Sequence, residues 1–212
     1  MDRGRFWRAG FPSPDFIDEI AHHLHQDPYE FRRALLQHER GKRQLAVLDL
    51  AAEKAGWRNP TSGHALGIAA FEAFGSYIAT VADISMKGQE MRLHRVVTAI
   101  DCGVAIHPDN IQAQLEGGMV YGLTAALRGK ITLVDGAVEQ TNFTDYTMLT
   151  MGETPGIECH VVPSTAEPGG IGEPGTAPIA PALANAIYAA TGNRLRSLPL
   201  SSHGVSYSAR RA

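Results

Sequence analysis

The residue best placed for chemistry is a glutamate in a glycine- and proline-rich stretch. Residues 166–178 read AEPGGIGEPGTAP and hold four glycines and three prolines, too many for a regular helix or strand. Glu173 lies here, with Gly170 and Gly172 before it and an alanine-rich helix predicted after it. Glycine lets backbone amides approach a ligand, and a carboxylate beside that ligand can act as a general base. The alternative is an ordinary solvated loop glutamate.

A second candidate group lies on a helix that contains several glycines. In the stretch QAQLEGGMVYGL, Gln114 is followed by Gly117, Gly118 and Gly122. Each glycine inside a helix costs about 1 kcal/mol relative to alanine, so such a helix usually needs close approach by a neighbour. That neighbour is either another backbone or a flat ligand. The Gln114 amide offers both a donor and an acceptor, which suits the edge of a heterocycle.

Residues 1–58 predict a small helical subdomain. The predicted helices cover residues 13–26, 27–37 and 43–57. Ser13 and Asp27 are the expected N-caps, and each is followed by a proline at the first helical position. The clustered histidines at 22, 23 and 25 are interpreted as a solvated helix face, because no carboxylate or cysteine stands at ligand spacing.

Residues 59–212 predict a domain of the α/β class, α+β in detail, with a mixed β-sheet and packed helices. The expected strand regions are 65–86, 90–101, 130–140, 156–164 and 194–200. The region 130–140 should form a hairpin that turns at Asp135-Gly136. The glycine-rich helix is predicted over 109–129 with Asp109 or Asn110 as its cap. The tail 201–212 is expected to be loose.

Composition excludes several classes of function. The net charge is −3 and no basic stripe is present, so nucleic acid is not an expected partner. Cys102 and Cys159 lie far apart without a CxxC motif, which argues against an iron–sulfur or zinc site in this chain and favours buried thiols. There is no run of 18 apolar residues and no signal peptide. We therefore expect a soluble, cytoplasmic chain, with export alongside a partner left open.

Three segments resemble one enzyme family. They are VVTAIDCGVAIHPDNIQAQLEGGMVYGLTAAL, DYTMLTMGETPGIECHVVPS and EPGGIGEPGTAPIAPALANAIYAATGNRLRSLPL. Together they resemble the C-terminal, molybdenum-cofactor-binding domain of the large subunit in the xanthine dehydrogenase/aldehyde oxidase family of hydroxylases, and most of all its isoquinoline 1-oxidoreductase branch. The resemblance covers about residues 11–200.

The resemblance implies a chemistry for the candidate residues. Members of the family hydroxylate a carbon of an aldehyde or N-heterocycle with oxygen from water. They use molybdenum on a pterin, in bacteria usually molybdopterin cytosine dinucleotide. The G-E-P glutamate is the family's catalytic base and corresponds to Glu173, while the Q-x-E-G glutamine contacts the pterin and corresponds to Gln114. Gly117, Gly118, Gly170 and Gly172 would line the cofactor, and no protein side chain would ligate the metal.

The chain also departs from the family. Family subunits are at least three times longer, and their other cofactor loops lie upstream of the part that this chain resembles. The expected partners are therefore a chain that carries those loops and an iron–sulfur subunit, with a second copy in a homo-oligomer as an alternative. The 59–212 domain would then hold only part of the cofactor pocket. The alternative is a truncated non-catalytic domain that folds or oligomerises without cofactor.

Overall fold

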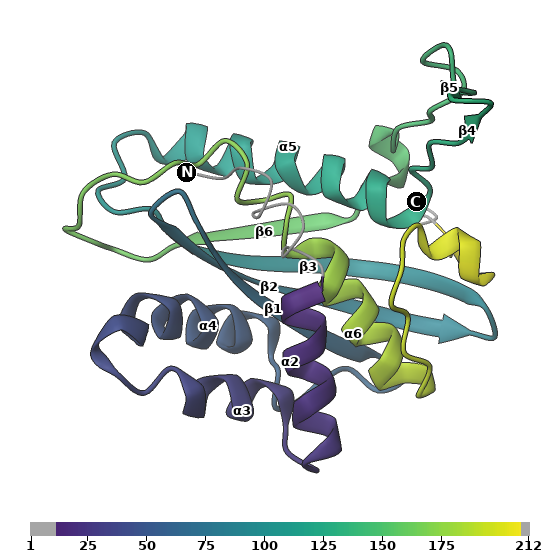
Figure 1. The fold of residues 1–212 in the computed structure, drawn as a ribbon. Coiled ribbons are helices and arrows are strands. Elements are labelled where there is room, and N and C mark those ends of the chain that lie inside the picture. Colours follow the sequence, from purple (N-terminus) through teal and green to yellow (C-terminus); the bar gives the residue numbers. More distant parts are fainter. Residues whose placement is uncertain (1–11, 209–212) are drawn as a thin grey trace.

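The computed structural model describes residues 12–208, in which a mixed sheet is covered by helices on both faces (Figure 1). The strands of the main sheet are β1 (Ala65–Ala73), β2 (Ser76–Lys87), β3 (Glu90–Asp101), β6 (Gly156–Val161) and β7 (Ser206–Ser208). The α-helices are α2 (Pro12–His23), α3 (Pro28–Leu35), α4 (Lys42–Ala55), α5 (Pro108–Leu127) and α6 (Ile179–Thr191). Short 3-10 turns cover Glu39–Gly41, Met151–Glu153 and Leu200–His203. This confirms the predicted fold class.

The sheet combines an antiparallel meander with two parallel additions. Strands β1, β2 and β3 pair antiparallel in sequence order. Strand β6 then pairs parallel with residues 95–100 of β3, and β7 pairs parallel with residues 90–92 of the same strand. A register shift at Asp83/Ile84 marks a bulge between β2 and β3. The apolar region 65–86 is therefore two strands that turn at Phe74-Gly75.

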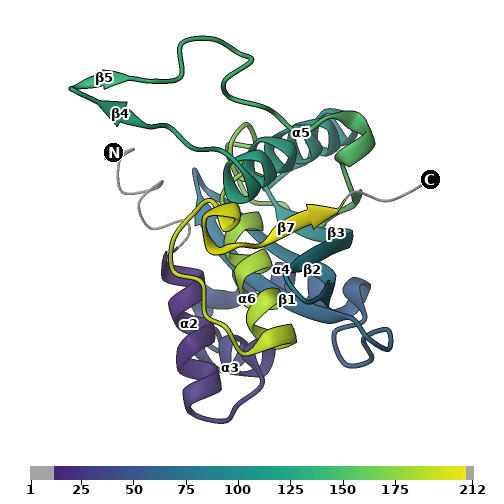
Figure 2. The ribbon, with the colours of Figure 1, turned by 90° about the vertical axis from the view of Figure 1, so that its right-hand side faces the viewer.

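Alternate residues of the strands face different helices. Ile68, Val81 and Val97 pack with α4 in one core. Ala82 and Val96 point to the other face, where they pack with α5 and α6. Figure 2 shows the two sets of helices on either side of the sheet. Helix α4 thus shares a core with the strands, while the division of the chain at residue 58 stays a prediction.

Several local predictions are confirmed. Asp27 caps α3, where its carboxylate accepts hydrogen bonds from the amides of Tyr29 and Glu30. Gly56 ends α4 in the left-handed conformation with φ of 70°. A small hairpin of β4 (Leu133–Val134) and β5 (Ala137–Val138) turns at Asp135-Gly136, as the Asp-Gly pair indicates.

Four predictions are wrong. Helix α2 already includes Ser13, so this residue is not its cap. Helix α5 begins at Pro108, and its cap is the His107 ring, whose Nδ1 accepts from the Asn110 amide; neither Asp109 nor Asn110 caps it. Residues 194–200 form no strand, because buried Arg194 turns toward α2 and bonds Asp15 and Asp18 there. The last strand is instead β7, within the tail expected to be loose.

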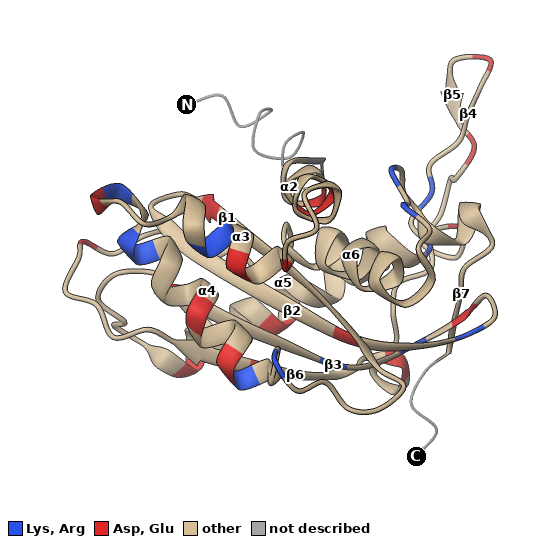
Figure 3. Cartoon of the chain, turned by 90° about the horizontal axis from the view of Figure 1, so that it is seen from below, with Lys and Arg blue, Asp and Glu red and all other residues tan. Residues whose placement is uncertain are grey.

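Charge is spread over the surface. Acidic and basic residues lie interspersed along α3, α4 and the strand ends (Figure 3). Within residues 12–208, no helix is long and apolar enough to cross a membrane. The same described residues contain no group of three His, Cys, Asp or Glu that could hold a metal ion, and the histidines on α2 are part of none.

Candidate functional site

The segment that carries Glu173 connects β6 to α6, and we call residues 162–178 the Glu173 loop. Hydrogen bonds fasten its first half to the ends of the meander strands. The Gly169 amide donates to the Cys102 carbonyl at 2.8 Å, and the Gly170 amide donates to the Phe74 carbonyl at 2.8 Å. The Ser76 hydroxyl donates to the Gly170 carbonyl at 2.7 Å. The loop therefore has its backbone bound to the body of the protein directly before Glu173.

The strand end that receives the loop needs a glycine. Gly103 has φ of 74°, and a methyl group there would lie 2.2 Å from the carbonyl oxygen of Glu167. The Val104 amide next to it donates to the Ala166 carbonyl at 3.0 Å. The D-C-G motif thus ends β3 with a left-handed residue against which the loop backbone packs.

The aspartate of the same motif is held by an arginine from α4. Arg43 Nε and Nη2 each lie 2.7 Å from one carboxylate oxygen of Asp101, a bidentate pair. Burial by itself raises the pKa of the Asp101 carboxyl, but hydrogen bonds from Arg43, the Gly103 amide and Ser164 outweigh it and hold the pKa below its ordinary value of 3.8. Asp101 is therefore a charged, buried group at the base of the loop.

The second half of the loop packs against the glycines of α5. A methyl group at Gly122 would lie 2.5 Å from the Thr176 carbonyl oxygen, and one at Gly118 would lie 3.2 Å from the Thr176 hydroxyl. A methyl group at Gly175 would lie 2.8 Å from the Leu115 carbonyl oxygen. On this face the neighbour that needs the glycines is another backbone of the same chain, one of the two alternatives that the sequence left open.

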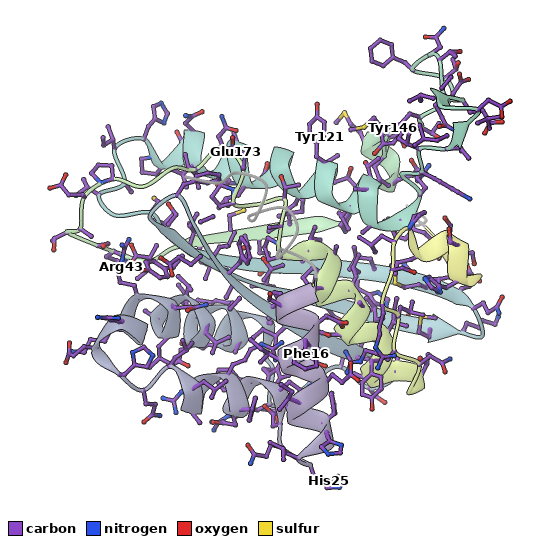
Figure 4. The ribbon with its side chains drawn as sticks, viewed as in Figure 1. Phe16, His25, Arg43, Tyr121, Tyr146 and Glu173 are labelled. Carbon is purple, nitrogen blue, oxygen red and sulfur yellow. The ribbon has the colours of Figure 1, made fainter. Side chains whose placement is uncertain are left out.

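Glu173 itself is exposed between these two attached halves. Its carboxylate makes no hydrogen bond or ion pair with any residue of 12–208, although its carbonyl accepts from the Thr176 amide at 2.9 Å. Figure 4 shows Glu173 beside α5, on the side of the molecule away from α3 and α4. A methyl group on the preceding Gly172 would meet nothing within 4 Å. The carboxylate is thus fixed through its backbone and open at its side chain.

The remaining predicted residues divide between open and packed surroundings. Gln114 and Gly117 lie on an exposed face of α5, and a methyl group at Gly117 would meet nothing within 4 Å. A methyl group at Gly170 would lie 2.8 Å from the Phe74 Cβ. Gly117 and Gly172 are therefore open to a ligand, while Gly118 and Gly170 also contact the chain's own atoms.

A groove beside Gly117 is a feature that the sequence did not reveal. It has a volume of about 590 Å³. Its walls are Ala113, Glu116, Gly117, Val120, Leu149, Met151, Thr154, Pro155 and Ile157. No sequence motif joins α5 to residues 149–157, so only the folded chain could show this groove.

The two cysteines, Cys102 directly after β3 and Cys159 in β6, are unreactive thiols. Burial, with a smaller contribution from the charge of Glu116, raises the pKa of the Cys159 thiol to about 12. Burial also raises the pKa of Cys102. Both are free thiols, and they stay protonated at neutral pH.

Comparison with known proteins assigns the chain to a family. Residues 29–155 match the family described as "Molybdopterin cofactor-binding domain". The chain belongs to this family. The matched residues of this molybdopterin cofactor-binding chain include Gln114, Gly117 and Gly118 but end before the Glu173 loop.

Curated relatives confirm the resemblance found in the sequence. The chain is 34% identical over 196 residues to isoquinoline 1-oxidoreductase subunit beta of Brevundimonas diminuta, which covers 90% of this chain and 25% of the relative. It is 32% identical over 205 residues to the "Membrane-bound aldehyde dehydrogenase [pyrroloquinoline-quinone]" of Gluconacetobacter polyoxogenes, covering 87% and 26%. The chain therefore spans about a quarter of the length of these relatives.

A solved structure supports the same fold. The aldehyde oxidoreductase of Desulfovibrio desulfuricans ATCC 27774 superposes with a TM-score of 0.52 at 20% identity, over 59% of this chain and 14% of that one. At this identity the likeness concerns the fold of the molybdopterin cofactor-binding chain.

Proposed function

We propose that this chain forms part of a molybdenum hydroxylase that hydroxylates an aldehyde or an N-heterocycle, with Glu173 as the catalytic base. The observation that carries the proposal is the state of Glu173: its backbone is fastened on both sides, and its carboxylate has no partner among residues 12–208. Family membership supports the choice of cofactor.

The residues around Glu173 fit a flat organic cofactor. Gln114 is exposed with an amide free to donate and accept, and there is open space above Gly117 and Gly172. We propose that these residues hold one edge of molybdopterin cytosine dinucleotide, which supplies two-electron redox chemistry when bound. Since no three potential protein ligands cluster in residues 12–208, the metal would rely on the pterin rather than on this chain.

Glu173 would move one proton. A carboxylate oxygen at the end of this side chain accepts the proton of the water that supplies oxygen to the substrate carbon. The fastened loop keeps the carboxylate oriented, which lowers the entropic cost of reaching the reactive geometry. The open side of the loop leaves room for an aldehyde or N-heterocycle.

The rest of the pocket would come from a partner. The chain spans about a quarter of its relatives. Tyr121 is 65% exposed and Met151 is 95% exposed near the groove, so apolar surface is available for association. We propose that a chain with the upstream cofactor loops covers this side and that an iron–sulfur subunit removes the electrons. Light scattering of the pure chain at micromolar concentration, alone and with that partner, measures this association.

The test of Glu173 uses the complex of this chain with a partner that carries the upstream cofactor loops. Glu173→Gln keeps the shape of the side chain and removes the base, so turnover should fall by about 10²–10⁴-fold while molybdenum and pterin contents stay unchanged. Glu167→Gln is the matched control, since Glu167 lies exposed on the same loop. If turnover of Glu173→Gln stays within about twofold of wild type, the base assignment is wrong.

The same preparation separates the enzyme from a non-catalytic domain. A complex that contains about one molybdenum and one pterin per chain agrees with the proposed function. A stable complex without either group would favour a domain that folds and assembles without cofactor.

A further inference from the structure

One guanidinium group connects α4 to both strand ends that hold the Glu173 loop. Arg43 binds the Asp101 carboxylate through Nε and Nη2, each at 2.7 Å, and Nη2 also reaches the Asp101 carbonyl at 3.3 Å. Its Nη1 donates to the Gly75 carbonyl at 3.3 Å. The group also stacks over the Tyr77 ring at 4.7 Å. Figure 4 shows Arg43 at the end of α4 that lies below these turns.

The two segments that Arg43 joins are the same two that fasten the loop. On the β3 side, Asp101 accepts from the Gly103 amide at 2.9 Å, and Cys102 accepts from the Gly169 amide. On the side of the β1–β2 turn, Gly75 lies between Phe74 and Ser76, which both bond Gly170. Gly169 and Gly170 are consecutive, so the two attachments hold the loop at neighbouring residues.

We infer that Arg43 is a positioning residue for Glu173, an inference that rests on the proposed role of Glu173 as base. Arg43 fixes the β1–β2 turn relative to the end of β3, and these two elements together fix Gly169 and Gly170 just before Glu173. The Asp101 side chain is only 4% exposed, so loss of Arg43 leaves a buried carboxylate without its main partner. The β2–β3 ladder still joins Tyr77 to Asp101. The Gly75 carbonyl and the Asp101 carboxylate beyond it lose their shared donor, so the turn, the strand end and the loop bonded to them are held less firmly.

The geometry also explains why this position holds arginine. A planar guanidinium can bind both carboxylate oxygens and still direct a third nitrogen to the Gly75 carbonyl. A lysine ammonium is a single point donor on a flexible stem and cannot make the same fork. Arg43→Lys should therefore keep charge and solubility while it loses the cross-link between the two attachments.

The first experiment measures the loop without the cofactor. Amide hydrogen exchange of the full chain is followed at Gly169 and Gly170 in wild type, Arg43→Lys and Arg43→Ala. We expect exchange at both amides to accelerate at least about tenfold in the variants, because the attachments open locally. Arg33→Ala is the matched control, since Arg33 also pairs with an aspartate, Asp49 at 2.9 Å, away from the loop.

The second experiment measures turnover in the complex with the partner chain. A misplacement of about 1 Å costs roughly 10²-fold, so Arg43→Lys should lower kcat by about 10- to 100-fold with KM and molybdenum content near wild type. In the Glu173→Gln background the same change should have little further effect, because Arg43 acts through Glu173. Arg33→Ala should change neither quantity.

The outcomes separate the two proposals. If Glu173→Gln leaves turnover unchanged, the proposed function is wrong, whatever Arg43 does. If Glu173→Gln abolishes turnover while Arg43→Lys changes neither kcat nor exchange at Gly169 and Gly170, only the positioning inference is overturned. A multiplicative loss in the double variant would assign Arg43 a separate structural role and also overturn it. Where Arg43→Ala fails to fold, Arg43→Lys carries the test.

Discussion

Two irregular segments of this chain differ in what holds them. The Glu173 loop is bonded to both strand ends and packs on α5. Residues 130–146, which we call the arm, project away from the body with the small hairpin at the far end (Figure 1). The hydrogen bonds of the arm join its own residues. The Glu139 amide donates to the Thr132 carbonyl, and the Gln140 side chain bonds the Thr132 amide and hydroxyl. The Asp145 carboxylate accepts from the Thr141 amide.

Under the proposed role of Glu173, attachment rather than composition is what distinguishes the two segments. Both segments are rich in turn residues, and both expose side chains. The arm presents Leu133 at 69% exposure and Phe143 at 94%, and within residues 12–208 no backbone–backbone hydrogen bond joins it to the sheet. The Glu173 loop has such bonds to the strand ends, through Gly169 and Gly170. A carboxylate in the proposed catalytic role needs that fixed backbone, because orientation lowers the entropic cost of reaching the reactive geometry.

The largest contrast is expected from alanine at two left-handed glycines. Gly103→Ala places a methyl group 2.2 Å from the Glu167 carbonyl, whereas Gly136 on the arm has nothing within 4 Å. Gly103→Ala should lower the free energy of unfolding by about 2–4 kcal/mol, and Gly136→Ala by about 1 kcal/mol or less. Urea unfolding measures both. Equal losses would mean that the loop is not packed as described.

The next largest contrast concerns how the free energy of unfolding changes at acid pH. The pKa of Asp101 is depressed, so the stability it provides is present above its ordinary value of 3.8 and is lost as pH falls through the lower folded pKa. Asp101→Asn should therefore be clearly less stable than wild type at pH 7, and the gap should narrow below about pH 4.

An aspartate on the arm provides the control for this pH dependence. Backbone amides of Thr141 and Asn142 also lower the pKa of Asp145, but that carboxylate is fully exposed. Asp145→Asn should change the pH dependence of global unfolding much less than Asp101→Asn, because solvent screens this exposed carboxylate. A gap between wild type and Asp101→Asn that is constant from pH 7 to pH 2 would contradict the role given to Asp101.

A smaller effect is expected on α5, with stability and binding moving in opposite directions. Gly117→Ala adds a methyl group in open space and should raise the free energy of unfolding by about 1 kcal/mol. The same methyl group should lower pterin occupancy in the complex. Gly118→Ala is the comparison, because its methyl group meets Thr176 at 3.2 Å. Unchanged pterin occupancy in Gly117→Ala would remove Gly117 from the cofactor surface.

The smallest effect is expected at the arm. Phe143→Ser should change the free energy of unfolding by no more than about 0.5 kcal/mol, because the ring is 94% exposed. Leu149→Ala, just past the arm and 7% exposed, should cost about 2–5 kcal/mol. Thermal unfolding of both variants checks this. A large loss in Phe143→Ser would show that the arm packs on the body.

Local signals were readable from the sequence because they act within a few residues. The Asp27 cap, the Gly56 helix end and the Asp135-Gly136 turn each depend on neighbouring backbone alone. Gly118 and Gly122 of α5 also indicated a close neighbour correctly, whereas Gly117 has none within 4 Å. The identity of that neighbour, Thr176 and Gly175 some fifty residues later, depends on how the chain folds back and was not readable.

Errors arose where a distant partner outweighed local pattern. Residues 194–200 alternate like a strand, but the sequence gives no sign that Arg194 bonds Asp15 and Asp18 on α2. Asp101 and Gly103 are near neighbours in the sequence, yet the arginine that binds Asp101, Arg43, lies 58 residues earlier on α4. The sequence could not predict that Gly117 is open while Gly118 is packed, because the two glycines are adjacent and identical in type.

The two edges of β3 take partners from different parts of the chain. One edge of β3 pairs with β2, which precedes it in the chain. The other edge pairs with β6 and β7, which are residues 156–161 and 206–208 and come much later in the chain. Without residues 156–161, the outer edge of β3 at apolar Val96 and Val97 would have no strand partner. A chain that ended before residue 156 would therefore be prone to pair with another copy along this edge.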